Sequence, residues 1–104
     1  MQARALSLVT SGPEREEAHI HLEGALDALS VDEVSSTIER VVADGAQRVI
    51  VDLERVTLLD SFGVGVLVSL WKRIKARGGQ VRVVSANDQP LAVLKILKLD
   101  RVLA

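Results

Sequence analysis

The stretch that decides the fold is Val49–Trp71, which with the preceding arginine reads RVIVDLERVTLLDSFGVGVLVSLW. It begins with a β-branched apolar run, Val49–Leu53, which is typical of a buried strand. A short turn segment is expected at Glu54–Leu59. From Val64 onward the apolar residues recur at helical spacing, and this spacing predicts an amphipathic helix. The expected apolar stripe of that helix consists of Val64, Leu67, Val68 and Trp71, widened by Val66 and Leu70.

The start of the predicted helix carries polar and small residues. Asp60 and Ser61 are good capping residues, because their side chains accept hydrogen bonds from free backbone N–H groups. Gly63 and Gly65 follow, and each costs a helix about 1 kcal/mol relative to alanine. Two interpretations stay open from the residues alone. In the first, the segment is simply a capped, buried helix whose glycines serve packing. In the second, the Ser61 hydroxyl is a regulated group, because a helix N-terminus favours a phosphate there.

Length and composition restrict the class of protein. A chain of 104 residues predicts one domain, 1–104, with a single core, and 48% hydrophobic with 26% charged residues is ordinary for a globular protein. A net charge of −1 gives no long-range attraction to nucleic acid. The absence of cysteine excludes disulfides and thiolate chemistry. No apolar run approaches about 20 residues and no signal-peptide pattern is present, so we expect a cytoplasmic protein without membrane insertion.

Segments upstream of the central stretch alternate between strand and helix patterns. We expect an edge strand at Ala5–Thr10 and a second strand at Ala18–Leu22, which Gly24–Asp27 ends. Ser30 with Glu33 forms a capping-box pattern at the start of a helix. The apolar face of that helix is predicted to hold Val34, Ile38, Val41 and Val42.

Downstream, the central helix ends in basic residues, of which we expect Lys72, Arg73 and Arg77 to be exposed as favourable charges at a helix C-terminus. A strand is predicted at Val81–Val84 and a final helix at Asp88–Leu97, with Val102–Leu103 starting a last strand. The apolar face of the final helix is expected to be Leu91, Leu94 and Leu97. Together these elements predict an α/β fold with a mixed sheet of about four to five strands and both longer helices on one face.

Motifs for catalysis or cofactor binding are missing from the sequence. The glycines at 63 and 65 make no dinucleotide fingerprint or phosphate loop, and Ser61 is not in a nucleophile elbow. His19 and His21 could share a metal on a strand, but no third ligand is evident. The acidic residues Asp27, Asp52 and Asp60 could pair, although nothing indicates a water-excluding cleft. We therefore expect no enzymatic activity, no metal and no cofactor.

Three motifs resemble one protein family. The segment LLDSFGVGVLVSLWKRIKARGG, residues 58–79, resembles the signature of the STAS domain, in particular that of bacterial anti-sigma factor antagonists. Leu22–Asp27 is similar to the family's Gly-Glu-φ-Asp element, and Val93–Val102 to its last helix and closing strand. The likeness covers nearly the whole chain in the correct order.

The resemblance implies a function and a set of site residues. It implies that the partner is an anti-sigma factor that is also a serine kinase, which the unphosphorylated chain binds, so that the sigma factor is released. Phosphorylation of Ser61 by that kinase would switch the binding off. A weak homodimer also stays open. The residues that the resemblance assigns to partner binding are Asp27, Asp60, Ser61, Phe62, Gly63, Val64 and Gly65.

The sequence departs from the family pattern in two places. Phe62 replaces a small residue that usually carries a hydroxyl, and it could add an apolar anchor to an interface. The chain also stops where relatives usually continue into a terminal helix. A second function of the same family stays open: an accessory or scaffold subunit of a membrane transporter or of a stress-sensing complex, without phosphorylation.

Overall fold

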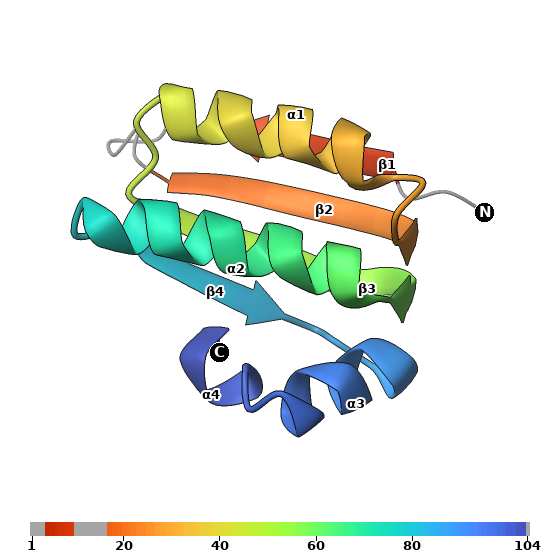
Figure 1. The fold of residues 1–104 in the computed structure, drawn as a ribbon. Coiled ribbons are helices and arrows are strands. Elements are labelled where there is room, and N and C mark those ends of the chain that lie inside the picture. Colours follow the sequence, from red (N-terminus) through yellow and green to blue (C-terminus); the bar gives the residue numbers. More distant parts are fainter. Residues whose placement is uncertain (1–3, 10–16, 104) are drawn as a thin grey trace.

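A computed structural model of the chain describes residues 4–9 and 17–103, with side chains for residues 17–101. Thr10, the last residue of the predicted edge strand, lies outside the described residues. Strands and helices alternate after an initial pair of strands (Figure 1). In chain order the elements are β1 (Arg4–Val9), β2 (Glu17–Leu26), α1 (Val31–Ala43), β3 (Arg48–Leu59), α2 (Ser61–Ala76), β4 (Gln80–Val84), α3 (Asp88–Ile96) and α4 (Asp100–Leu103).

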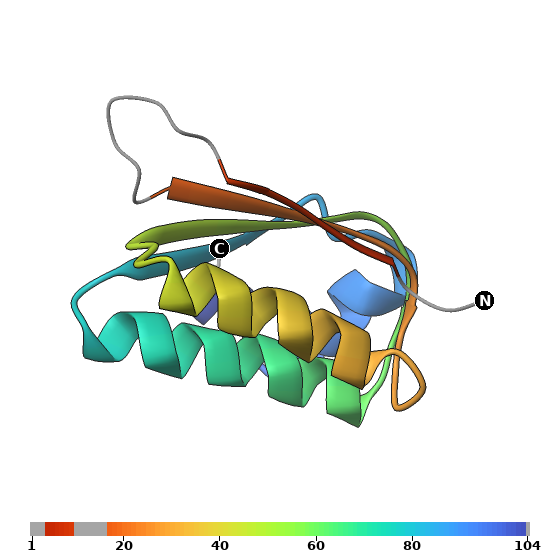
Figure 2. The same ribbon diagram turned by 90° about the horizontal axis from the view of Figure 1, so that it is seen from above.

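The strands form one mixed sheet in the order β1-β2-β3-β4. β1 pairs with β2 in antiparallel fashion, whereas β2, β3 and β4 are parallel. Parallel neighbours need a crossover connection, which α1 supplies between β2 and β3 and α2 between β3 and β4. Both helices lie on the same side of the sheet (Figure 2). The predicted mixed α/β fold is confirmed, while a fifth strand is not confirmed in the part of the chain that is described.

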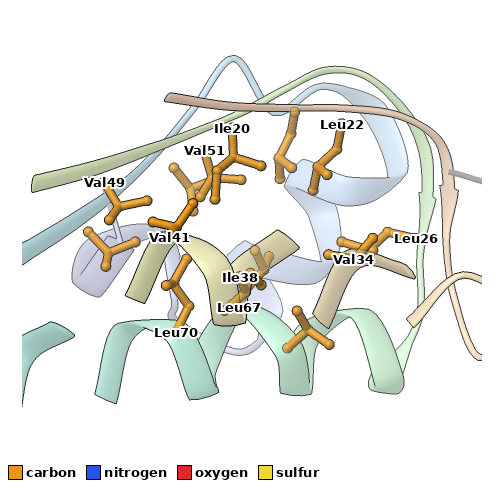
Figure 3. Close-up of a cluster of buried hydrophobic side chains, with 14 of the residues drawn as sticks. Ile20, Leu22, Leu26, Val34, Ile38, Val41, Val49, Val51, Leu67 and Leu70 are labelled. Atoms are coloured by element: carbon orange, nitrogen blue, oxygen red, sulfur yellow. The ribbon is translucent and has the colours of Figure 1, made fainter. Parts of the chain in front are cut away.

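The core lies between the sheet and the helices α1 and α2 (Figure 3). It is aliphatic, as the composition predicts, and burying each large side chain of this kind stabilises the fold by about 1.5–3 kcal/mol. Side chains from all three parallel strands and both helices contribute. The largest fully buried residues are Ile20, Leu26, Leu53, Leu59, Leu67, Leu70 and Ile74, with Val34, Val41, Val49 and Val51.

Two strands are longer than predicted. β3 continues through the segment Glu54–Leu59, which was expected to be a turn, and β2 continues through Gly24 to Leu26. The two strands stay paired because the register shifts once between His21 and Glu23 and again between Gly24 and Ala25, where irregularities absorb extra residues. Gly24 has a φ of 87°, a conformation that glycine adopts without strain. The result is that Leu26 pairs with Leu59, so both strands end side by side.

The buried face of α2 differs from the predicted stripe. Leu67 is buried as expected, and so are Val66 and Leu70 at the edge of the predicted stripe, but Val64, Val68 and Trp71 are only half-buried. The fully buried positions are Gly63, Val66, Leu67, Leu70 and Ile74. The helix is thus rotated so that the row through Gly63 faces the sheet, because a glycine there lets the helix approach the strands closely.

The chain after α2 contains three further corrections. Arg77 is half-buried rather than exposed, because its guanidinium donates to the carbonyl oxygens of Val42 at the end of α1 (2.9 Å) and of Ala46 in the segment after it. The strand predicted at Val102–Leu103 is instead the short helix α4, which packs on β4. Leu97 is 49% exposed, because α3 ends at Ile96 and Leu97 no longer belongs to the helix.

Candidate functional site

The candidate site lies where the carboxyl ends of β2 and β3 meet. Leu26 and Leu59 are the last residues of these strands and are paired in the sheet. The chain leaves β2 into a loop, residues 27–30, and leaves β3 through Asp60 directly into α2. The predicted residues Asp27 and Asp60 therefore follow neighbouring strand ends, which the sequence alone did not reveal.

Asp60 connects three segments at this edge of the sheet. Its backbone N–H donates to the Leu26 carbonyl oxygen at 3.3 Å. Its carboxylate oxygen Oδ1 accepts from the backbone N–H of Gly63 at 3.0 Å, which confirms the predicted helix cap. The second oxygen, Oδ2, accepts from the backbone N–H of Ala28 at 3.2 Å. One side chain thus caps α2 and also holds the loop that follows β2.

The loop after β2 is further held by Ser30, which is 1% exposed. Its hydroxyl donates to the Ala25 carbonyl oxygen at 2.9 Å and accepts from the Asp27 N–H at 3.1 Å. The predicted capping box is therefore wrong, because this hydroxyl is occupied within the loop and makes no cap hydrogen bond to α1. The Asp27 carboxylate accepts from the Leu29 N–H at 3.0 Å, and the Leu29 side chain is 76% exposed.

A side chain from α3, that of Gln89, also holds the end of β3. Its amide oxygen accepts from the Leu59 N–H at 2.8 Å, and its amide nitrogen donates to the Leu59 carbonyl oxygen at 2.9 Å. The Gln89 amide thereby bonds both backbone groups of Leu59, as a neighbouring strand would, just before Asp60. No local signal in the sequence points to this residue, because its partner lies 30 positions away.

The first turn of α2 presents an exposed hydroxyl next to an exposed aromatic ring. Ser61 is exposed, and its hydroxyl forms no hydrogen bond with any residue that the structure describes. Phe62 is 57% exposed. Val64 is half-buried and Gly65 is exposed, whereas Gly63 faces the sheet. The residues predicted for partner binding are thus brought to one end of the molecule, except that Gly63 has no free surface.

The two helix glycines have different surroundings. A Cβ atom on Gly63 would clash with the Leu26 carbonyl oxygen and lie 2.7 Å from Cδ1 of Leu59. A Cβ atom on Gly65 would meet nothing within 4 Å. Gly63 is therefore required by packing at the strand ends, while Gly65 faces open space.

The two histidines lie on the other face of the sheet. Nε2 of His19 is 2.8 Å from Glu17, and Nδ1 of His21 is 3.4 Å from Asp52. Within the described ranges, no group of three or more His, Cys, Asp or Glu side chains is arranged to hold a metal ion. Equally, none of the helices in these ranges is long and apolar enough to cross a membrane.

Comparison with solved structures identifies the fold. The chain is similar to the anti-sigma factor antagonist SpoIIAA in its unphosphorylated form, with a TM-score of 0.79 and 23% identity over 96% of this chain and 84% of that one. It is also similar to an anti-sigma factor antagonist from Mycobacterium paratuberculosis, with a TM-score of 0.82 and 20% identity over 95% of this chain and 80% of that one. At these identities the likeness establishes the fold alone.

Sequence comparison identifies the family. Proteins of Thermotoga neapolitana and Thermotoga maritima, provisionally named anti-sigma factor antagonists, are 36% identical over 58 residues, which is 56% of this chain and 51% of each relative. The match thus spans about half the length of these curated relatives. The family model described as STAS domain matches residues 12–104. The resemblance in the motifs is therefore confirmed, and the chain belongs to the STAS domain family.

Proposed function

We propose that this protein is an anti-sigma factor antagonist whose binding to an anti-sigma factor is switched off by phosphorylation of Ser61. The observation that carries the proposal is the exposed Ser61 hydroxyl, which is free of hydrogen bonds to the described residues and starts a helix beside exposed Phe62. The names of the structural neighbours and of the Thermotoga relatives support the same class of function.

The first turn of α2 can carry a phosphate without rearrangement of the fold. Free N–H groups and the helix dipole at an N-terminus favour an anion. Asp60 already accepts from the Gly63 N–H, so the new charge stands beside an existing one. Phosphorylation adds about −1.5 to −2 charges at pH 7. Because Ser61 is exposed, most of this charge stays solvated in the free protein, and its stability changes little.

The phosphate mainly changes the free energy of binding to the partner. A partner that covers Phe62 must also desolvate the neighbouring dianion, and Asp27 and Asp60 offer it no compensating positive charge. A penalty of about 3 kcal/mol would weaken binding roughly a hundredfold, because every 1.4 kcal/mol is about tenfold. The partner that fits this switch is an anti-sigma factor that is itself a serine kinase using ATP.

The test combines labelling and binding. The purified anti-sigma kinase with labelled ATP should phosphorylate the parent and Ser36→Ala but not Ser61→Ala; Ser36 is the control, an exposed serine on α1. In titration calorimetry, Ser61→Ala should bind like the parent, whereas Ser61→Glu should bind poorly and keep its circular dichroism spectrum.

Two results would contradict the proposal. One is labelling of another residue together with unchanged binding of Ser61→Glu, which would leave Ser61 as a residue of the helix start only. The other is a parent chain that binds no anti-sigma factor but assembles with a transporter ATPase, which would favour the accessory-subunit function.

A further inference from the structure

A groove of about 330 Å³ runs between α1 and α2 and begins at the candidate site. Ser61 and Phe62 line one end of it. At the other end, the guanidinium of Arg73 on α2 forms an ion pair with Glu39 on α1, which joins the two helices. The groove is thus continuous with the surface that carries the proposed phosphorylation site.

The groove is lined in part by small residues on the two facing helices. On α2 the row at four-residue spacing is Ser61, Gly65, Ser69 and Arg73, and Ser35 faces it from α1. Residues at this spacing lie on one face of a helix. Apolar atoms of Ile38 and Val66, which are 5% and 8% exposed, line the groove as well. Such a channel has an apolar base and room for an added side chain.

Packing within the described residues does not require a glycine at position 65. It costs the helix about 1 kcal/mol relative to alanine, yet a Cβ atom there would contact nothing. In contrast to Gly63, it serves no packing contact within the described residues. No residue in the described part of the chain fills the space that it leaves, so this space is open to a partner molecule.

The end of the groove at Ser61 is acidic. Asp32 and Glu33 lie in the first turn of α1, and Asp27 and Asp60 in the adjoining loops. The sequence has no lysine or arginine between residues 17 and 39 or between residues 56 and 71. Since both helices follow parallel strands, their N-termini lie at this same end (Figure 1). A complementary partner would carry positive charge beside the group that enters the groove.

We propose that this groove receives an apolar side chain of the anti-sigma factor, on a segment with basic residues that face the acidic end. This inference rests on the proposed function and deepens it. Because Ser61 lines the groove, a phosphate on its hydroxyl would occupy the entrance and exclude the apolar side chain. The free-energy cost of desolvating the phosphate at the groove entrance exceeds its attraction to an exposed basic residue of the partner, because solvent screens that attraction.

The experiment fills the groove and measures binding to the purified anti-sigma factor. Gly65→Leu places a large side chain in the open space, and Ala76→Leu adds similar bulk at an exposed position of α2 outside the groove. We expect Gly65→Leu to raise Kd about tenfold to a hundredfold, the effect of losing one buried apolar side chain, and Ala76→Leu to leave it unchanged. The double variant Asp32→Asn, Glu33→Gln should slow association and reduce its dependence on salt.

Each outcome decides the question. If Gly65→Leu binds like the parent, or if Ala76→Leu weakens binding equally, the groove inference is overturned while the proposed function stands. If the parent itself does not bind the anti-sigma factor, the proposed function fails and the inference fails with it. Should Gly65→Leu lose its circular dichroism spectrum, Ser35→Leu fills the groove from α1, and the same expectation then applies to it.

Discussion

Gly63 and Gly65 lie in the same turn of α2 and face two different regions of the molecule. Gly63 lies against the ends of β2 and β3, where the Leu26 carbonyl oxygen leaves no room for a methyl group. Gly65 faces the groove beside Ser61, where a methyl group would touch nothing. The same residue type therefore serves packing at one position and leaves a free surface at the other.

This difference extends to the residues around each glycine. On the inner side, Leu26, Leu59 and Leu67 are at most 1% exposed and hold α2 on the sheet. On the outer side, the exposed Phe62 and Leu29 have no core to contact. The inner side should accordingly govern the stability of the fold, and the outer side should govern recognition. Four substitutions test this division, starting from the largest expected effect.

Gly63→Ala should destabilise the protein most. The added methyl group must displace backbone and leucine atoms, and overpacking of this kind costs about 3 kcal/mol. Urea unfolding followed by circular dichroism measures the loss. An unfolding free energy equal to that of the parent would mean that α2 does not approach the strand ends as closely as described.

Asp60→Ala should cost about 2 kcal/mol, since a lost helix cap costs up to that amount and the Ala28 N–H loses its acceptor as well. The same urea experiment applies. Asp32→Ala is the control, because it removes an exposed carboxylate from the first turn of α1 that affects only the helix dipole, by about 0.3 kcal/mol. Equal losses in the two variants would contradict the role of Asp60 in joining the loop to the helix.

Gly65→Ala should stabilise the protein by about 1 kcal/mol, since alanine is the better helix former and its methyl group meets open space. The opposite signs at positions 63 and 65 are the direct signature of the two surroundings. A destabilised Gly65→Ala would indicate that this side of α2 is packed after all.

The smallest effect concerns the ion pair at the far end of the groove. The hydrogen bond from Arg73 lowers the pKa of the Glu39 carboxyl below its ordinary value. Because the pKa of Glu39 is lower in the folded state, the ion pair stabilises the fold fully above the unfolded-state pKa of about 4.3. This stabilisation is lost as the pH falls through the folded-state pKa. Glu39→Gln should therefore reduce stability slightly at pH 7 and not at pH 2. Equal effects at both pH values would contradict the pair.

Much of the fold was predictable because it follows local patterns. The β-branched run at Val49–Leu53 and the helical spacing after Val64 lie within single elements, so the sequence indicated strand and helix correctly. The extension of β3 through Leu59 was missed. Leu59 at the end of this extension pairs with Leu26 of β2, and irregularities around Gly24 keep the two strands in register. Such pairing is a property of the sheet and not of either segment.

The candidate site was predictable as a set of residues but not as a geometry. The motif indicated Asp60 and Ser61, and the cap to the Gly63 N–H is confirmed. The contact between Asp60 and the Ala28 N–H spans 32 positions, and the Gln89 amide reaches Leu59 over 30. These contacts depend on where the strands end together, which no local pattern reveals. For the same reason the sequence did not distinguish the surroundings of the two glycines.

The most direct test of the division between the two sides of α2 is to phosphorylate Ser61 and measure stability and binding on the same sample. We predict that the unfolding free energy changes by less than about 1 kcal/mol, because the phosphate stays solvated at a helix N-terminus, while Kd for the anti-sigma factor rises roughly a hundredfold. Unchanged binding, or a loss of stability as large as that of Gly63→Ala, would contradict it.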